Sequence, residues 1–380
     1  MMKQFILFLF MFNIFGIAQQ KVEVQFIVIT NALADSEHVS ISGNSTELGN
    51  WNAEKIILNR VNDTTYSKSF KFSAGENIEY KITRGSWDKE AVESDGSVPK
   101  NSFMRINADT IIVVRIAGWK DQFKQKLHGQ ITGRVEYIKN YQFGILEPRD
   151  IIIWLPPSYS IDPQRHFPVL YLQDGQNVFD PATSSFGYDW RFDEVADSLI
   201  NIGEIEELII VGIYNTKYRW QEYSPGDTGA VYMNLIVNKI KPMIDSLFRT
   251  LPQRESTFVG GSSMGGLISF MLLWQYPEIF SKAICVSPAF KIGDINYVTT
   301  VKNYQDEQKP IKIYIDNGEV GLESELQPGI DDMLIALQNR NYQMNSNLFW
   351  YKYDNAQHSE RDWSKRVWRM LKFLFDKSLE

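Results

Sequence analysis

Residues 256–275 read STFVGGSSMGGLISFMLLWQ, and this stretch decides the fold that we expect for the larger part of the chain. It starts with a short apolar run, passes through a turn rich in glycine and serine, and ends in apolar residues at helical spacing. The turn GSSMG at 261–265 fits the pattern Gly-x-Ser-x-Gly, in which a sharp strand-to-helix turn exposes a serine hydroxyl. Ser263 is therefore predicted to be a nucleophile, and the flanking glycines leave room for the turn.

The pattern alone is weak, because a glycine-rich turn without any chemistry is the alternative. The apolar run before it and the helical segment at 267–275 supply the strand–turn–helix setting that the chemistry needs. A serine alcohol also needs a base to take its proton, and in this arrangement the order along the chain is serine, acid, histidine. His358 is the only histidine after Ser263, so we predict that it is the general base.

The acid that orients this histidine has several candidates among the residues. It is expected after the apolar strand at 311–315, where Asp316, Glu319 and Glu323 are candidates. Asp354 lies four residues before the histidine and is a weaker choice. Each of these carboxylates, taken alone, is also typical of a solvated surface.

Negative charge that develops in acyl transfer needs two convergent N–H donors. The N–H of Met264, at the start of the helix that follows the nucleophile, is the first. The second is expected in QDGQN at 173–177, the loop after an apolar strand. We assign it to Gln176, because Gly175 permits a tight backbone there; an ordinary polar turn is the alternative.

The sequence has two regions with different residue patterns. Residues 21–117 hold short β-prone runs separated by turn-rich pieces, which is typical of a small β-sandwich. Residues 132–380 alternate apolar strands with helical segments, which implies a mostly parallel sheet covered on both faces. The polar segment between them, 118–131, is interpreted as a linker. A length of 380 residues agrees with about two domains.

The first residues are typical of a secretory signal. Lys3 gives a positive start, residues 5–17 are almost all apolar, and small residues lead to Ala18. A signal at 1–18 predicts a secreted or periplasmic protein, and an uncleaved anchor is the alternative. The apolar stretch is too short for a good membrane span, and we expect none after removal of the signal. Cys285 is the single cysteine, so an intrachain disulfide is excluded.

Composition excludes some partners. The formal net charge of −7 argues against a nucleic-acid partner, which would require a basic face. The 23 Phe, 18 Tyr and 10 Trp are a high aromatic content, which suits apolar cores and also surfaces that stack on flat ligands.

Residues 132–380 resemble the esterase D and feruloyl esterase group of α/β-hydrolases. The resemblance implies an α/β-hydrolase doubly wound sheet, here preceded by a small all-β sandwich. It also implies carboxyl-ester hydrolysis through an acyl-serine intermediate, with neither cofactor nor metal. Members of the group act on acylated sugars, feruloylated glycans, small thioesters or cyclic siderophore esters. The likeness rests on LQDGQNVFD at 172–180, VGIYN at 211–215 with Arg219 and Glu222-Tyr223, GSSMGG at 261–266, and His358-Ser359-Glu360 with Trp363.

The chain departs from this family at two positions. The family's acid usually lies shortly after the glycine that ends its strand, at a position that corresponds to Gly321 here. Glu323 is the nearest later carboxylate and is our first choice for the acid, with Asp316 as the second choice. Ser359 stands where the family has asparagine after the histidine.

Residues 21–117 resemble starch-binding carbohydrate modules, in which two tryptophans stack against sugar rings. The apolar face of a sugar packs well on an indole ring. Trp51 and Trp87 would be the platforms, with Lys81 and Asn101 as polar partners of the sugar hydroxyls. Buried core tryptophans, or a spacer domain that binds no glycan, are the alternatives. The likeness rests on VSISG at 39–43, ELGNWN at 47–52, EYK at 79–81 and RGSW at 84–87.

Three functions follow. The first is a secreted serine esterase that acts on acylated carbohydrate and is held on a glycan by its N-terminal module. The second is a siderophore or small-ester hydrolase with a non-binding N-terminal domain, and the third is a non-catalytic glycan-binding protein. Transfer of the acyl group to an acceptor other than water remains open as a further possibility.

Overall fold

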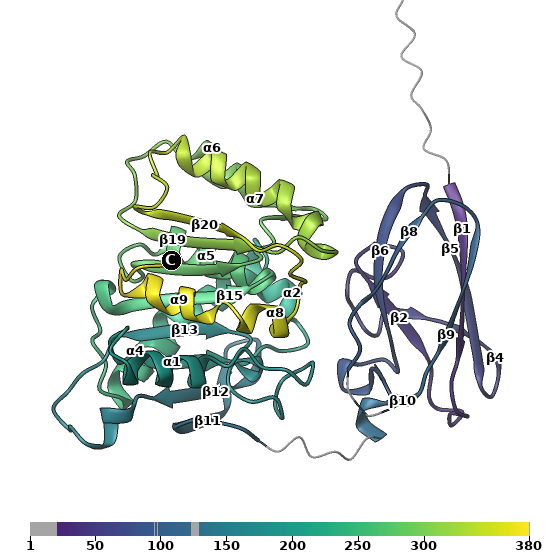
Figure 1. Ribbon diagram of the computed structural model, residues 1–380, viewed down its shortest axis with the longest axis horizontal. Coiled ribbons are helices and arrows are strands. Elements are labelled where there is room, and N and C mark those ends of the chain that lie inside the picture. The colour runs from purple at the N-terminus through teal and green to yellow at the C-terminus, as the bar shows by residue number, and fades with distance from the viewer. Residues whose placement is uncertain (1–20, 95, 97, 123–128, 380) are drawn as a thin grey trace, which may run out of the picture. The chain divides into compact units, whose positions relative to one another are not determined.

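The computed structural model describes residues 21–94, 96, 98–122 and 129–379, so the predicted signal at 1–18 lies outside the described residues. The chain divides into two compact units, one that ends at Gln122 and one that begins at Phe123. The first consists mainly of strands, and the second alternates strands with helices (Figure 1).

The first unit is a β-sandwich. Its two main sheets have the strand orders β4-β5-β1-β9 and β3-β2-β6-β8. Every second side chain of β1 points into the shared core, because a strand repeats every two residues. The strands are β1 (Lys21–Ile29), β2 (Ser40–Gly43), β3 (Ile56–Ile57), β4 (Asn59–Asn62), β5 (Thr65–Ser73), β6 (Glu76–Thr83), β7 (Ala91–Val92), β8 (Ser102–Ile106), β9 (Thr110–Arg115) and β10 (Gly118–Trp119).

The packing of the first unit extends to Trp119. This residue lies on β10, which pairs with β7, and its side chain is buried in the core of the sandwich. Its indole Nε1 donates a hydrogen bond to the hydroxyl of Thr30 at 3.1 Å. Gly118 and Trp119, at the start of the expected linker, therefore pack with the first unit.

The second unit is built on a mostly parallel sheet with the order β11-β12-β14-β13-β15-β16-β19-β20. The pairs β11–β12 and β12–β14 are antiparallel, and the other neighbours are parallel. A short hairpin, β17–β18, lies outside this sheet. The strands are β11 (Arg134–Phe143), β12 (Leu146–Leu155), β13 (Val169–Gln173), β14 (Ile209–Ile213), β15 (Thr257–Ser262), β16 (Lys282–Val286), β17 (Lys291–Ile292), β18 (Ile295–Asn296), β19 (Lys312–Asn317) and β20 (Leu348–Lys352).

Helices cover both faces of this sheet. Residues of α1 and α9 share one apolar core with one face of the sheet, and residues of α3, α4, α5, α6 and α7 share the core of the other face. Figure 1 shows α1, α8 and α9 in front of the sheet and α5 behind it. The helices are α1 (Phe192–Asn201), α2 (Arg219–Glu222), α3 (Asp227–Leu235), α4 (Lys241–Leu247), α5 (Met264–Gln275), α6 (Val298–Asn303), α7 (Leu322–Gln338), α8 (Glu360–Ser364) and α9 (Val367–Leu374).

The topology brings the predicted site residues to one edge of the sheet. Gln176, Ser263, Glu323 and His358 follow the carboxyl ends of β13, β15, β19 and β20. These strands are parallel, so their carboxyl ends meet at the same edge, where open α/β sheets bind ligands.

Among the described residues, none of the helices has both the length and the apolar character that a membrane span needs.

Candidate active site

Ser263 lies in the turn between β15 and α5, with φ at 57° and ψ at −122°. This conformation is strained for a residue with a side chain and is found mostly where surrounding contacts enforce it. Here the N–H of Ser263 donates to the carbonyl of Val286 at 2.9 Å, and its own carbonyl accepts from Leu267 at 3.0 Å and Ala289 at 3.1 Å. The turn is therefore held from both sides, in the conformation that projects a serine side chain at a strand-to-helix junction.

The glycine spacing around this serine has a steric cause. A Cβ atom on Gly261 would lie 2.7 Å from both the backbone carbon and the oxygen of Gly265. Real Cβ atoms do not approach backbone atoms so closely, so position 261 excludes every side chain. The first glycine of the motif is therefore required by backbone packing inside the turn, independently of any chemistry at the serine.

His358 lies in the loop between β20 and α8. Its Nδ1 is 3.3 Å from Oε1 of Glu323, which is an ion-pair distance without good hydrogen-bond geometry. The imidazole packs edge-on against Trp363, with ring centroids 4.8 Å apart. No hydrogen bond joins the Ser263 hydroxyl to His358 within the described residues. Such catalytic contacts often tighten only in the complex with substrate.

Glu323 lies in the first turn of α7 and is fully buried. Its Oε2 accepts the N–H of Gly318 at 2.8 Å, and its Oε1 accepts the hydroxyl of Ser287 at 2.7 Å. Burial favours its protonated form, but His358, Arg366 and the N–H of Gly318 outweigh burial and hold the pKa of Glu323 below its ordinary value. An ionised carboxylate at this place can orient the imidazole and stabilise its charged form.

Asp316, the second choice for the acid, has other partners. The hydroxyl of Tyr314 donates to its Oδ2 at 2.9 Å, and the guanidinium of Arg366 lies 3.4 Å from its Oδ1. Burial raises the pKa of Asp316 to about 6, against the lowering effect of Arg366. The other two candidates, Glu319 and Asp354, are exposed. Of the four carboxylates, the structure thus brings Glu323 to His358.

Two buried residues that the sequence did not single out support this acid. Ser287 follows β16 with φ at 42°, and its hydroxyl accepts from Nε1 of Trp363 at 3.0 Å while donating to Glu323. Arg366, which is 1% exposed, donates to the same hydroxyl at 3.2 Å. Neither residue belongs to a recognisable motif, so only its contacts reveal its position beside the acid.

The two predicted oxyanion donors lie on neighbouring backbone segments. Gln176 lies in the 3₁₀ turn Gly175–Asn177, and Met264 is the first residue of α5. Neither N–H has a hydrogen-bond partner among the described residues. A Cβ atom on Gly265 would lie 3.1 Å from Oδ2 of Asp174, so the loop after β13 contacts the start of α5. Two unpaired donors at this junction are suited to a developing oxyanion.

The tight backbone of this loop has a different origin from the one expected. The left-handed residue is Asp174, with φ at 57°, and not Gly175. Gly175 is required because a Cβ atom there would lie 2.3 Å from the backbone carbon of Gly212 on β14. Asp174 is held by Nε and Nη2 of Arg219, both at 2.7 Å, and by Nδ2 of Asn215 at 2.6 Å. This network fixes the loop that carries Gln176.

In the first unit, the structure brings the two predicted platform tryptophans together. The ring centroids of Trp51 and Trp87 are 6.4 Å apart, with 39° between the ring planes. The predicted polar partners have carboxylate partners of their own. Lys81 forms an ion pair of 2.9 Å with the buried Glu90, and Asn101 donates to Glu79 at 2.9 Å. Glycan binding by these four residues stays a prediction.

Two family models match the chain. Residues 145–374 match the family described as "Putative esterase", and residues 21–106 match the one described as "Starch binding domain".

Relatives of known sequence match parts of the chain. Over 155 residues it is 29% identical to the uncharacterized protein YbbA of Bacillus subtilis. This match covers 37% of this chain and 57% of that protein. It is 27% identical over 132 residues to an endo-1,4-beta-xylanase/feruloyl esterase of Xylanibacter ruminicola, covering 34% of this chain and 18% of that protein. The chain thus spans little more than half of the first relative's length and a smaller part of the second.

Solved structures share the fold. A ferulic acid esterase superposes with a TM-score of 0.54 at 19% identity and covers 64% of this chain and 98% of that chain. The enterobactin esterase FES from Shigella flexneri has a TM-score of 0.53 at 13% identity and covers 94% of each chain. Together with the sheet order, these structures confirm the predicted α/β-hydrolase fold preceded by a β-sandwich.

Proposed function

The chain belongs to the "Putative esterase" family of carboxylic ester hydrolases, and from this premise we propose that it cleaves esters through an acyl-serine intermediate on Ser263. The observation that carries the mechanism is the contact of 3.3 Å between Nδ1 of His358 and Oε1 of the buried Glu323. It leaves Nε2 of the imidazole free of protein partners among the described residues, and therefore available for the serine proton.

The proposed reaction has two half-reactions. His358 takes the proton of the Ser263 hydroxyl as its oxygen attacks the ester carbonyl, and Glu323 stabilises the imidazolium. The N–H groups of Met264 and Gln176 donate to the oxyanion. The imidazolium then protonates the leaving alcohol, which departs and leaves the acyl-serine. In the second half, His358 activates a water that releases the acid and restores the serine.

The proposed substrate is an acylated carbohydrate with acetyl or feruloyl esters. The match of residues 21–106 to a starch-binding domain supports a glycan contact, with Trp51 and Trp87 as the stacking surface. A module tethered to the enzyme raises the local concentration of ester without changing the chemistry. The relative from Xylanibacter ruminicola, named for xylanase and feruloyl esterase activities, agrees with a glycan-linked ester.

A secreted or periplasmic location is part of this proposal. Lys3, the apolar residues 5–17 and the small residues before the predicted cleavage near Ala18 support it.

A second candidate function is a siderophore or small-ester hydrolase with a non-binding N-terminal domain. It is favoured by the ion pair of Lys81 with Glu90 and by the hydrogen bond of Asn101 to Glu79, because these contacts engage both predicted polar partners within the protein.

Two measurements test these functions with the full chain. Hydrolysis of p-nitrophenyl acetate and methyl ferulate by the wild type should be lost in Ser263→Ala. Full activity in that variant would refute the serine mechanism, and an inactive wild type that binds glycan would favour the non-catalytic function. Sedimentation with insoluble starch should be retained in Ser263→Ala and lost in Trp51→Ala. A wild type that ignores starch and other glycans but cleaves siderophore esters would support the second candidate.

A further inference from the structure

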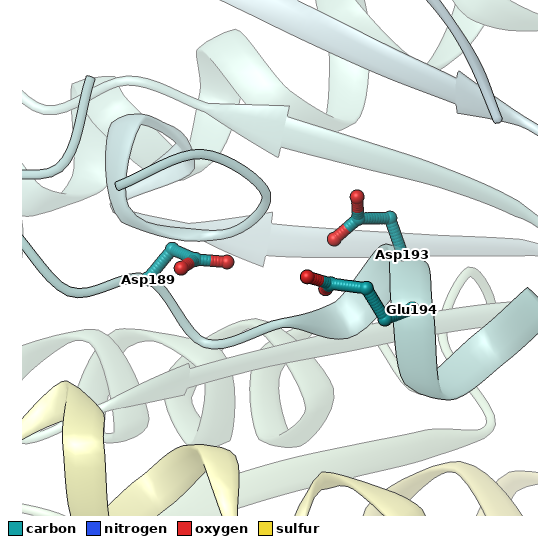
Figure 2. Close-up of side chains that lie close together, drawn as sticks. All are labelled: Asp189, Asp193 and Glu194. Carbon is teal, nitrogen blue, oxygen red and sulfur yellow. The ribbon is translucent and has the colours of Figure 1, made fainter. Parts of the chain in front are cut away.

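Three carboxylates outside the candidate active site converge at the start of α1. Asp189 precedes the helix, and Asp193 and Glu194 lie in its first turn. Each offers an oxygen, and these three oxygens all lie within 4.8 Å of one another. Figure 2 shows the carboxylates of Asp189 and Glu194 pointing toward each other, with that of Asp193 beside them.

Two oxygens of this cluster are buried without a donor. Asp193 is fully buried; its Oδ2 accepts the N–H of Thr132 at 2.6 Å, but its Oδ1 has no hydrogen-bond partner among the described residues. The Oε2 atom of Glu194 is also buried and also has no hydrogen-bond partner among the described residues. A buried carboxylate oxygen that lacks a donor is costly, and such groups in native proteins usually have a water or an ion beside them. A bound cation would satisfy both oxygens, as would a proton shared between Asp193 and Glu194.

The charges of the cluster are not balanced by its neighbours. Arg191 supplies a guanidinium 3.4 Å from Oε1 of Glu194, but its side chain is more than half exposed. Burial and a side-chain hydrogen bond with Glu194 raise the pKa of Asp193, and burial and the charge of Glu194 raise the pKa of Asp189 to about 6. The cluster can therefore be neutralised in two ways, by a proton on Asp193 or by a bound cation.

We propose that Asp189, Asp193 and Glu194 bind a calcium ion, with water completing its coordination. Carboxylate oxygens are the ligands of hard cations, and Ca²⁺ takes them at about 2.3–2.6 Å, so that two opposite oxygens lie about 4.8 Å apart. The three oxygens all lie within 4.8 Å of one another, so one ion of this size can contact all three. Mg²⁺ at about 2.0–2.1 Å demands a tighter, near-octahedral set. This site is independent of the proposed ester hydrolysis.

A cation here would fix a segment that contacts the candidate active site. Trp190, which follows Asp189 in the chain, packs on Trp363 with ring centroids 5.4 Å apart, and Trp363 in turn packs on His358. The N–H of Trp190 also donates to the carbonyl of Asn177 at 2.8 Å, in the loop that carries Gln176. The ion would thus hold a tryptophan that bonds to the loop carrying Gln176 and reaches His358 through Trp363.

The test is titration of the full chain, freed of metal by chelation, with CaCl₂ in a calorimeter. One ion should bind per chain, with a dissociation constant of about 10⁻⁴ to 10⁻³ M, as in sites with few protein ligands. The midpoint of thermal unfolding should rise with CaCl₂, and MgCl₂ should have a smaller effect. Asp193→Asn and Glu194→Gln should each weaken binding at least about tenfold.

The matched control is Asp197→Asn, which removes the same charge from the same helix outside the cluster and should bind CaCl₂ like the wild type. Because Asp193→Asn also alters the bond to Thr132, Glu194→Gln provides a test that spares this bond. No binding by the wild type at about 10 mM CaCl₂, or equal binding by the wild type and both cluster variants, would overturn the proposal. The proposal would also be overturned if Asp193→Asn were more stable than the wild type while CaCl₂ stabilised neither protein. In that case a proton on Asp193, and not a cation, neutralises the cluster.

Discussion

Replacing Glu323 with glutamine keeps the shape of the side chain and removes its charge. Its single amide oxygen can keep the bond from the N–H of Gly318, which Oε2 accepts at 2.8 Å, but the bond that Oε1 accepts from Ser287 at 2.7 Å is then lost. We therefore expect Glu323→Gln to fold with a stability lower by about 1 kcal/mol for the lost bond, and with its larger effect on the reaction.

The size of the loss follows from the distance to the histidine. When His358 takes the serine proton, its positive charge lies close to the carboxylate, since Nδ1 and Oε1 are 3.3 Å apart. At an effective dielectric constant of about 20, this attraction is about 5 kcal/mol, which corresponds to a few thousandfold in rate. Arg366 lies 3.9 Å from the same oxygen and offsets part of that attraction. We expect kcat/KM to fall by about 10³, near the range known for loss of a triad carboxylate.

Two further variants test whether Glu323, and not Asp316, acts on His358. Asp316→Asn removes the other buried carboxylate and one partner of Arg366, so we expect about 3 kcal/mol of lost stability but less than about tenfold loss of kcat/KM for the folded protein. Glu323→Asp keeps the charge and withdraws it by about one bond length of 1.5 Å, so its activity should lie between wild type and Glu323→Gln.

The assay is the initial rate of p-nitrophenyl acetate hydrolysis, corrected for the folded fraction measured by circular dichroism. The reasoning fails if Asp316→Asn loses about a thousandfold while Glu323→Gln loses less than about tenfold. It also fails if both variants retain wild-type rates, since the buried carboxylate then does not act through the histidine.

Three further predictions concern the turn, the oxyanion loop and pH. Ser263→Gly and Ser263→Ala should both be inactive, but the glycine variant should be more stable by about 1 kcal/mol because glycine tolerates φ of 57°; equal melting midpoints would contradict the strain. Gly175→Ala should lower the unfolding free energy by about 2 kcal/mol and reduce kcat, because its Cβ meets the backbone of Gly212 at 2.3 Å; an unchanged denaturation midpoint in urea would contradict the close approach. The fold lowers the pKa of Glu323, so its stabilising effect is complete above the unfolded-state pKa of about 4.3 and is lost as pH falls through the folded-state pKa. The melting difference between wild type and Glu323→Gln should therefore shrink as pH falls from about 6 to about 3, and a difference that grows in acid would reverse the sign argued here.

Much of the architecture was predictable because it depends on short-range periodicity. The apolar runs of β13, β15 and β19 lie where the sequence predicts strands. The helix after Ser263 begins at Met264, as the motif requires. These features follow from the period of a strand or a helix and from steric limits within a few residues.

The boundary between the two units could not be read with the same accuracy. Trp119 lies in a polar, charged stretch that is typical of a linker, yet its indole fills the core of the sandwich and pairs with Thr30. A contact between residues so far apart in sequence leaves no local pattern.

The sequence by itself determined the strained turn at Ser263, the order of serine and histidine, and the two-part architecture, because backbone sterics and hydrophobic periodicity act between near neighbours. Only the tertiary structure decided which carboxylate reaches His358, since Asp316 and Glu323 lie seven positions apart on the same strand–loop–helix connection and differ in whether Arg366 or the imidazole lies beside them. It also brought Asp189 to Asp193 and Glu194, whose spacing forms no metal-binding motif. Charge pairing in a buried site depends on positions in space, and packing of distant segments sets those positions.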